Sequence, residues 1–271
     1  MRSPKEITLD NRIIESLTAL TQSGKAVEAA KLALGDDEIR ALQEYANTVS
    51  IKRLGYNDHG PVHMRTVALN TVIMSGLLRK AGIRMSLETE ECGVFEDSLT
   101  ALILAAVVHD TGMSVSRQDH EIHSAYLAYP ILDRILREVY GGDIQKRIMV
   151  RSLALEAISG HMGNRIIHSL EAGVLLIADG CDMTKGRARI PMALAGSPKV
   201  GDIHKYSANS IEEVRISPGQ ERPIRIEIIM SSEIGLFQVE EVLLGKISAS
   251  TAKGYIELYA LVYDRKAKRY L

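Results

Sequence analysis

The segment "DSLTALILAAVVHD", residues 97–110, constrains the fold of this chain more than any other stretch. Nearly every position from Leu99 to Val108 is apolar, so a helix here would be apolar on all sides and must lie among other helices. The segment nevertheless ends on two titratable residues, His109 and Asp110. A buried carboxylate needs a cation or several hydrogen-bond donors. The sequence therefore predicts a helical core with a polar centre at one end of a buried helix.

Most of the first 200 residues carry apolar side chains at helical spacing. Pro61 precedes the segment "VHMRTVALNTVIMSGLLRKAG", in the place where proline suits the first turn of a helix. The segment "SLEAGVLLIADGCDM" predicts a second buried helix, with Glu171 in its first turn and Asp179 near its end. We therefore expect residues 1–200 to form an all-helical domain.

The pattern changes after about residue 200. "IEEVRI" and "RPIRIEIIM" alternate with period two around the turn "SPGQ", "SEIGLFQVEEVLLGK" has helical spacing, and "GYIELYALVYD" alternates again. Residues 201–271 are therefore predicted to be a small α+β domain of order ββαβ, joined through the linker "IPMALAGSPKVGD". The expected fold class is mostly α.

The composition excludes several classes of protein. A formal net charge of −1 over 271 residues gives no general attraction to nucleic acid or to an anionic membrane. Two cysteines indicate no disulfide framework and favour a reducing compartment. The N-terminal segment lacks the apolar region of a signal peptide, and no run of 18 apolar residues occurs. We expect a cytoplasmic protein with neither membrane nor nucleic acid as a partner.

Eight histidines lie between positions 59 and 204, and several of them adjoin carboxylates at the ends of apolar segments. One buried histidine is usually a core residue, but two buried carboxylates together with several imidazoles indicate a transition-metal site. This donor set suits Fe, Mn, Co or Ni, and also Zn. Since no thiolate belongs to the set, a structural zinc site is disfavoured.

The order of these residues resembles the HD superfamily of metal-dependent phosphohydrolases. The likeness covers roughly residues 50–190 and depends on "HMRTVA", "LILAAVVHDTG" and "LLIADGCDMTKGR". It implies that His63, His109, Asp110 and Asp179 hold one divalent metal ion.

Many members of that superfamily bind a second ion, which the resemblance assigns to Asp110, to His120 in "HEIHSA" and to His161 in "AISGHMG". His123 competes with His120 for this place. The two remaining histidines on the C-terminal side are predicted to be capping, surface or structural residues: His168 and His204.

The segment "NDHGPVH" is similar to the H-x-x-x-H of mammalian-type cyclic nucleotide phosphodiesterases, in which the first histidine protonates the leaving oxygen. If Pro61 begins a helix, His59 lies just outside its N-terminus, where anions collect. A histidine is a suitable acid at such a place. His59 is therefore a candidate general acid. The other predicted catalytic residue is Asp110. The alternative is that His59 merely caps the helix.

Three basic residues follow Asp179 in "DMTKGRARIP": Lys185, Arg187 and Arg189. They could bind a phosphate from the end of the same helix, or they could form a solvated basic loop. The chain departs from the HD-GYP cyclic-di-GMP phosphodiesterases, because "HDTGM" lacks their lysine and no GYP occurs. That substrate is not expected.

The resemblance implies a hydrolase of a small phosphate mono- or diester, in which metal activates water. The overall pattern is similar to archaeal HD proteins, which suggests a nucleotide or a 2′,3′-cyclic phosphate such as a dihydroneopterin cyclic phosphate. The alternative is a nucleotide-sensing regulatory module without turnover, although the complete ligand set argues against it. The C-terminal strands could pair with a second copy in a homodimer or bind a small ligand. They could also simply cover the helical core, which is the favoured interpretation.

Overall fold

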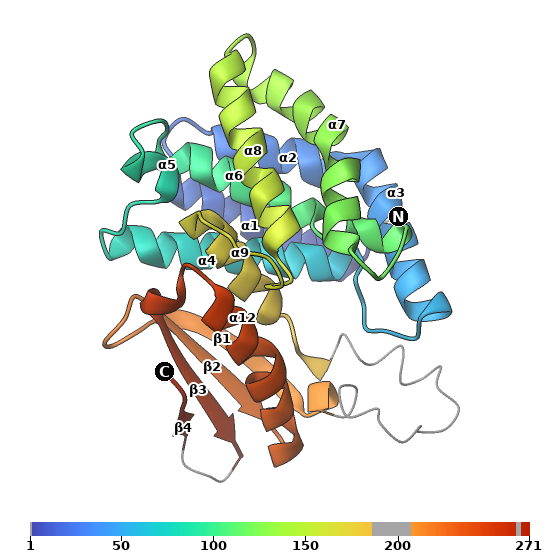
Figure 1. Ribbon diagram of the computed structural model, residues 1–271, viewed down its shortest axis with the longest axis vertical. Coiled ribbons are helices and arrows are strands. Elements are labelled where there is room, and N and C mark those ends of the chain that lie inside the picture. Colours follow the sequence, from blue (N-terminus) through green and yellow to red (C-terminus); the bar gives the residue numbers. More distant parts are fainter. Residues whose placement is uncertain (1, 186–206, 264–266) are drawn as a thin grey trace.

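The computed structural model describes residues 2–185, 207–263 and 267–271. A helical part is followed by a small part built on a four-stranded sheet (Figure 1). The predicted fold class, mostly α with a small α+β C-terminal part, is confirmed. The expected linker, residues 190–202, lies outside the described residues, as does the predicted boundary at residue 200. Within the described ranges, no helix is both long enough and apolar enough to cross a bilayer.

The helical part has its predicted buried helix, α6, in the middle (Figure 1). Every residue of α6 is buried, and the helix packs against α2, α4, α8 and α9. The elements of this part are α1 Pro4–Leu20, α2 Lys25–Gly35, α3 Asp37–Thr48, the π-helical turn η1 Val49–Arg53, α4 Pro61–Lys80, α5 Ser86–Thr89, α6 Phe95–Val108, the 3-10 turn η2 Thr111–Ser114, α7 His120–Tyr140, α8 Ile144–Gly160 and α9 Leu170–Gly180.

The C-terminal sheet has the strand order β1-β2-β3-β4. Strand β1 is antiparallel to β2, β2 is parallel to β3, and β3 is antiparallel to β4. A parallel pair needs a crossover connection, which explains the helical segment between β2 and β3. The elements are β1 Ile211–Pro218, β2 Ile224–Met230, η3 Glu233–Gly235, η4 Gln238–Leu243, α12 Leu244–Ala249, η5 Lys253–Tyr255, β3 Ile256–Val262 and β4 Lys268–Arg269.

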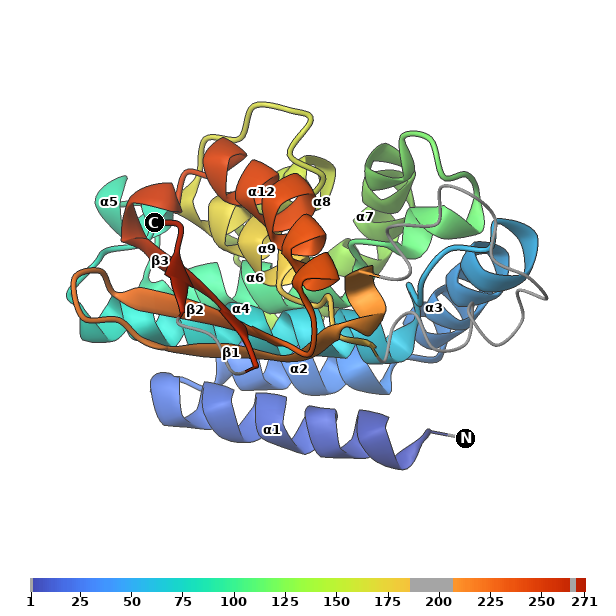
Figure 2. The ribbon, with the colours of Figure 1, turned by 90° about the horizontal axis from the view of Figure 1, so that it is seen from below.

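The sheet shares its apolar core with the helices. Strand β2 buries alternate residues, from Ile224 to Met230, and these side chains belong to the same continuous cluster as the core of the helical part. Strands β1 and β2 contact α4, while α12 packs against α9 (Figure 2). The C-terminal part therefore covers the side of the bundle on which α9 ends.

Candidate metal centre

Five helix ends meet at one buried point. The first turn of α4, the C-terminus of α6, the first residue of α7, the C-cap of α8 and the last turn of α9 each contribute polar side chains. All six predicted ligands are there and all are buried: His63, His109, Asp110, His120, His161 and Asp179. Because they come from five separate elements, packing of the helices holds them together.

Side chains stabilise the end of α6. The carbonyls of its last three residues accept hydrogen bonds from His109 Nδ1 (2.9 Å), Gln43 Nε2 (2.6 Å) and Thr111 Oγ1 (2.8 Å). Gly112 lets α7 begin directly against this end, because a Cβ at Gly112 would overlap the backbone of α7 at the carbonyl of His120. The "HDTG" sequence therefore closes the helix and brings the next predicted ligand, His120, close.

Asp110 lies between two pairs of imidazoles. Its Oδ2 is 3.1 Å from His63 Nε2 and 3.4 Å from His109 Nε2. Its Oδ1 is 3.1 Å from His120 Nε2 and 3.2 Å from His161 Nε2. Each carboxylate oxygen thus faces its own pair of nitrogens, which is the arrangement that a ligand shared between two ions requires.

Asp179 completes the first of these groups. Its Oδ1 lies 3.3 Å from His63 Nε2 and 3.7 Å from His109 Nε2. Ligand atoms about 2.1 Å from a common ion lie roughly 3–3.5 Å from one another, so the spacing of these donors fits a transition-metal ion. The buried cluster of histidines and aspartates could therefore hold metal.

The outer ring nitrogens fix the imidazole orientations. Nδ1 of His109 and Nδ1 of His161 each face the carbonyl oxygen of the residue three positions earlier, at 2.9 and 2.6 Å, while His63 Nδ1 is 2.7 Å from Asp182 Oδ2. With the protons on Nδ1, the Nε2 lone pairs face Asp110. Nε2 of His109 is buried and has no hydrogen-bond partner among the described residues. Lone pairs that face a carboxylate at this distance are unfavourable unless a cation or a proton lies between them.

Protons would compete with metal for this cluster. Burial opposes charge on His109, but the carboxylates of Asp110 and Asp179 outweigh it and raise the pKa of His109 to about 9. Burial lowers the pKa of His161 to about 4, with Asp110 opposing the shift. Burial raises the pKa of Asp110, but His109 outweighs it and holds this pKa well below its usual range. Burial also raises the pKa of Asp179, but Lys246 and His109 hold that pKa well below its usual range. Without metal, the cluster therefore retains a proton on His109 at neutral pH.

Metal affinity should consequently rise with pH. Because metal displaces the His109 proton, we expect a gain of about tenfold per pH unit between pH 6.5 and 9. Titration calorimetry with Mn²⁺ in buffers of different ionisation enthalpy measures both the affinity and the proton released. An affinity independent of pH would contradict this assignment. In the metal-free protein, His109 has a raised pKa, so its contribution to stability is full below pH 6.5 and is lost as the pH rises through 9.

Two further residues support the predicted ligands, and neither of them was predicted from the sequence. Asp182 orients His63; it lies three residues after Asp179, a spacing that could have suggested a shared site. Lys246 of α12 donates hydrogen bonds to Asp179 Oδ2 and, at 2.9 Å, to the carbonyl of His161. No sequence signal connects Lys246 to the centre, because 67 residues separate it from Asp179.

His59 lies at the start of α4, beside the cluster. Pro61 is the first residue of that helix, as predicted. The ring of His59 is edge-on to that of His63, with centroids 5.8 Å apart. Its Nδ1 is 2.6 Å from the carbonyl oxygen of Asn57 and 2.9 Å from Ser50 Oγ. These contacts fix the ring next to the predicted ligand.

The remaining predicted residues belong to none of the candidate ligand groups or lie outside the described ranges. His123 is partly buried on α7 and belongs to none of the candidate ligand groups, whereas His120 faces Asp110. His168 is exposed. Lys185 is exposed and forms an ion pair with Glu212 of β1. Three residues are not described by the structure: Arg187, Arg189 and His204.

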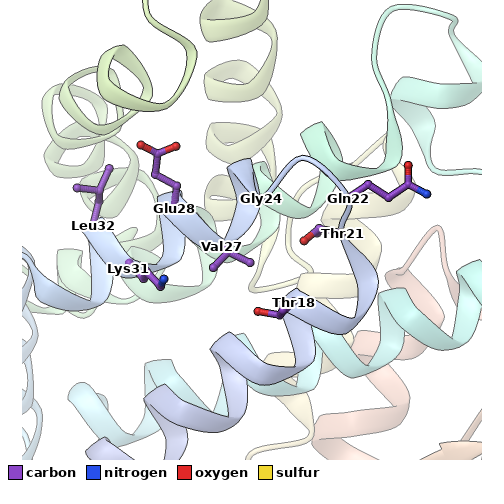
Figure 3. A pocket seen from close by; sticks show the side chains of 8 residues that line it. All are labelled: Thr18, Thr21, Gln22, Gly24, Val27, Glu28, Lys31 and Leu32. Carbon is purple, nitrogen blue, oxygen red and sulfur yellow. The ribbon is translucent and has the colours of Figure 1, made fainter.

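A hollow of about 550 Å³ lies elsewhere, between the end of α1 and α2 (Figure 3). Its lining contains one acid and one lysine but neither histidine nor cysteine, so it offers no set of metal ligands. The lining residues are Thr18, Thr21, Gln22, Gly24, Val27, Glu28, Lys31 and Leu32. The buried cluster at the helix ends is therefore the candidate functional site.

The fold and the cluster define a mostly helical protein with a buried His/Asp centre that could bind metal. The chain is 44% identical over 229 residues to the uncharacterized protein MJ1020 of Methanocaldococcus jannaschii; the match covers 84% of this chain and 86% of that protein. The chain belongs to the same family as this archaeal protein. No family model matches the chain, and no solved structure matches it.

Proposed function

We propose that this protein is an HD-superfamily phosphohydrolase that uses divalent transition-metal ions to hydrolyse a phosphate mono- or diester. The observation that supports this most directly is the position of Asp110, whose two oxygens each face a separate pair of imidazoles. A carboxylate so placed serves as the shared ligand of two ions, a device for hydrolysing phosphate esters.

The donors suit Fe, Mn, Co or Ni, with Zn also compatible. Cys181 is buried but belongs to none of the candidate ligand groups among the described residues, so the proposed donors include no soft ligand. One ion would be held by His63, His109, Asp110 and Asp179. A second would be held by the shared carboxylate with two further imidazoles: His120 and His161.

Metal bound here would supply positive charge to the phosphoryl oxygens and would lower the pKa of water. The chain supplies orientation. Asp182 holds the ring of His63, and backbone carbonyls hold His109 and His161, so the Nε2 atoms need no rearrangement. His59 lies at the N-terminus of α4, where backbone N–H groups favour an anion. In the proposed reaction, His59 would give a proton to the leaving oxygen.

From the resemblance, we propose that the substrate is a nucleotide or a 2′,3′-cyclic phosphate, such as a dihydroneopterin cyclic phosphate. A further proposal is that the C-terminal strands pair with those of a second copy and form a homodimer. A nucleotide-sensing module without turnover is the alternative function. It would bind nucleotides through the same centre but would release no product.

Elemental analysis and a substrate panel test the proposal together. Protein purified without chelator should contain two transition-metal ions per chain and should hydrolyse bis-para-nitrophenyl phosphate, para-nitrophenyl phosphate or nucleoside 2′,3′-cyclic phosphates. Chelation should abolish the activity, and Mn²⁺ should restore it. Full metal content with nucleotide binding but no turnover would identify the sensor instead. Absence of bound metal after metal reconstitution would refute the hydrolase.

A further inference from the structure

The C-terminal part reaches the candidate metal centre through Lys246 of α12. Its ammonium group donates hydrogen bonds to Asp179 Oδ2 and to the carbonyl oxygen of His161, at the end of α8. Only 12% of the Lys246 side chain is exposed. The other oxygen of Asp179, Oδ1, faces the Nε2 atoms of His63 and His109. The two oxygens of Asp179 therefore have different partners, one towards the candidate ligands and one towards the C-terminal part.

We propose that Lys246 is a positioning residue of the metal centre, an inference that rests on the proposed metal binding. By holding Oδ2, the ammonium group fixes the rotation of the Asp179 carboxylate so that Oδ1 faces the ion. Through the carbonyl of His161, the same group connects α9 to the end of α8. The C-terminal part thus completes the centre, in addition to covering the helices.

The packing of α12 on α9 supports this role. Gly173 and Gly180 are seven residues apart and so lie on the same face of α9. A Cβ at Gly173 would overlap the hydroxyl of Thr251, and one at Gly180 would lie 3.1 Å from Cδ of Lys246. The absence of both side chains lets α12 approach closely. As a result, the aliphatic stem of Lys246 crosses Gly180 and its ammonium reaches Asp179.

The partners of Lys246 distinguish positioning from substrate binding. A lysine that binds phosphate presents its charge to the incoming ligand. Here the lysine side chain is largely buried, and its ammonium group contacts acceptors on two different helix ends. Groups that orient metal ligands from behind typically change metal affinity by about 10–100-fold when they are removed.

The test is Mn²⁺ affinity of the full chain, measured by calorimetry for wild type, Lys246→Met and Lys246→Arg. Methionine keeps much of the stem and removes the charge, so we expect affinity to fall by about 10–100-fold, with arginine intermediate. The control is Lys253→Met, which removes an exposed lysine of the same part and should leave affinity unchanged. Excess Mn²⁺ should restore kcat in Lys246→Met, with the KM for the phosphate ester unchanged.

Circular dichroism shows whether each variant folds. If Lys246→Met does not fold, Gly173→Ala provides the second test: it retains the lysine but pushes the Thr251 segment, and α12 with it, away from α9, so Mn²⁺ affinity should again fall. If wild type binds no Mn²⁺, the proposed metal centre fails and the role of Lys246 with it. If wild type binds Mn²⁺ and the folded variant binds it equally or more tightly, the positioning role alone is overturned. Unchanged Mn²⁺ affinity with a raised KM would make Lys246 a substrate contact and would overturn it too.

Discussion

Replacing Asp110 with asparagine should remove both metal binding and hydrolysis. Each oxygen of this carboxylate faces a different pair of imidazoles, so both proposed ions depend on it. Asparagine keeps the shape of the side chain but lacks its charge and one of its two oxygens. Metal should stabilise the transition state by several kcal/mol. If Asp110→Asn loses about 4 kcal/mol of this stabilisation, the rate should fall by roughly 10³-fold.

Metal should also fail to stabilise the Asp110→Asn variant against unfolding. With metal at about 100 times its Kd, wild type should gain about 2.7 kcal/mol in free energy of unfolding, and Asp110→Asn should gain nothing. Unfolding curves with and without Mn²⁺, together with elemental analysis, measure this difference. Asp133→Asn is the matched control, because this partly buried aspartate of α7 pairs with Arg137 and Arg151 outside the cluster. Full metal content in Asp110→Asn would disprove the assignment.

The elements that the sequence predicts well are those with a strong periodic pattern. α6 and α9 are apolar on nearly all sides, and a helix of that kind has no stable place except among other helices. The alternating strands around β2 are equally clear, because half of their side chains enter the core. In contrast, β4 has two residues, too few for any period to show.

Three of the six predicted ligands, His109, Asp110 and Asp179, could be found because they end or interrupt an apolar pattern, where a polar side chain needs a partner. The other three followed from the resemblance to the HD superfamily: His63, His120 and His161. The sequence gives no such signal for the residues that support the predicted site. Gln43 bonds a carbonyl 64 residues away, and Lys246 bonds an aspartate 67 residues away. Glutamine and lysine are ordinary residues of amphipathic helices, so only the packing of α3 on the end of α6, and of α12 on α9, reveals what they do. Local pattern identifies candidate ligands, but tertiary contacts determine how they are oriented.

His59→Ala should keep the metal and lose rate. The ring is fixed by the carbonyl of Asn57 and lies edge-on to His63, outside the candidate ligand groups, so its removal should leave the cluster intact. A well-placed general acid contributes about 10²–10⁴-fold. We expect a loss of that order on an ester with an alkoxide leaving group, such as a 2′,3′-cyclic phosphate, because an alkoxide leaves slowly without a proton.

A comparison of two leaving groups shows whether His59 has a catalytic or a structural role. para-Nitrophenolate departs without a proton, so the loss in His59→Ala should shrink to a few-fold on para-nitrophenyl esters if His59 is the acid. Metal content should equal that of wild type, and His168→Ala, which removes an exposed histidine, should lose no rate on either substrate. Equal losses on both leaving groups would mean that His59 only binds substrate or shapes the start of α4. The comparison with cyclic nucleotide phosphodiesterases would then fail, while the metal centre would stand on the Asp110 result.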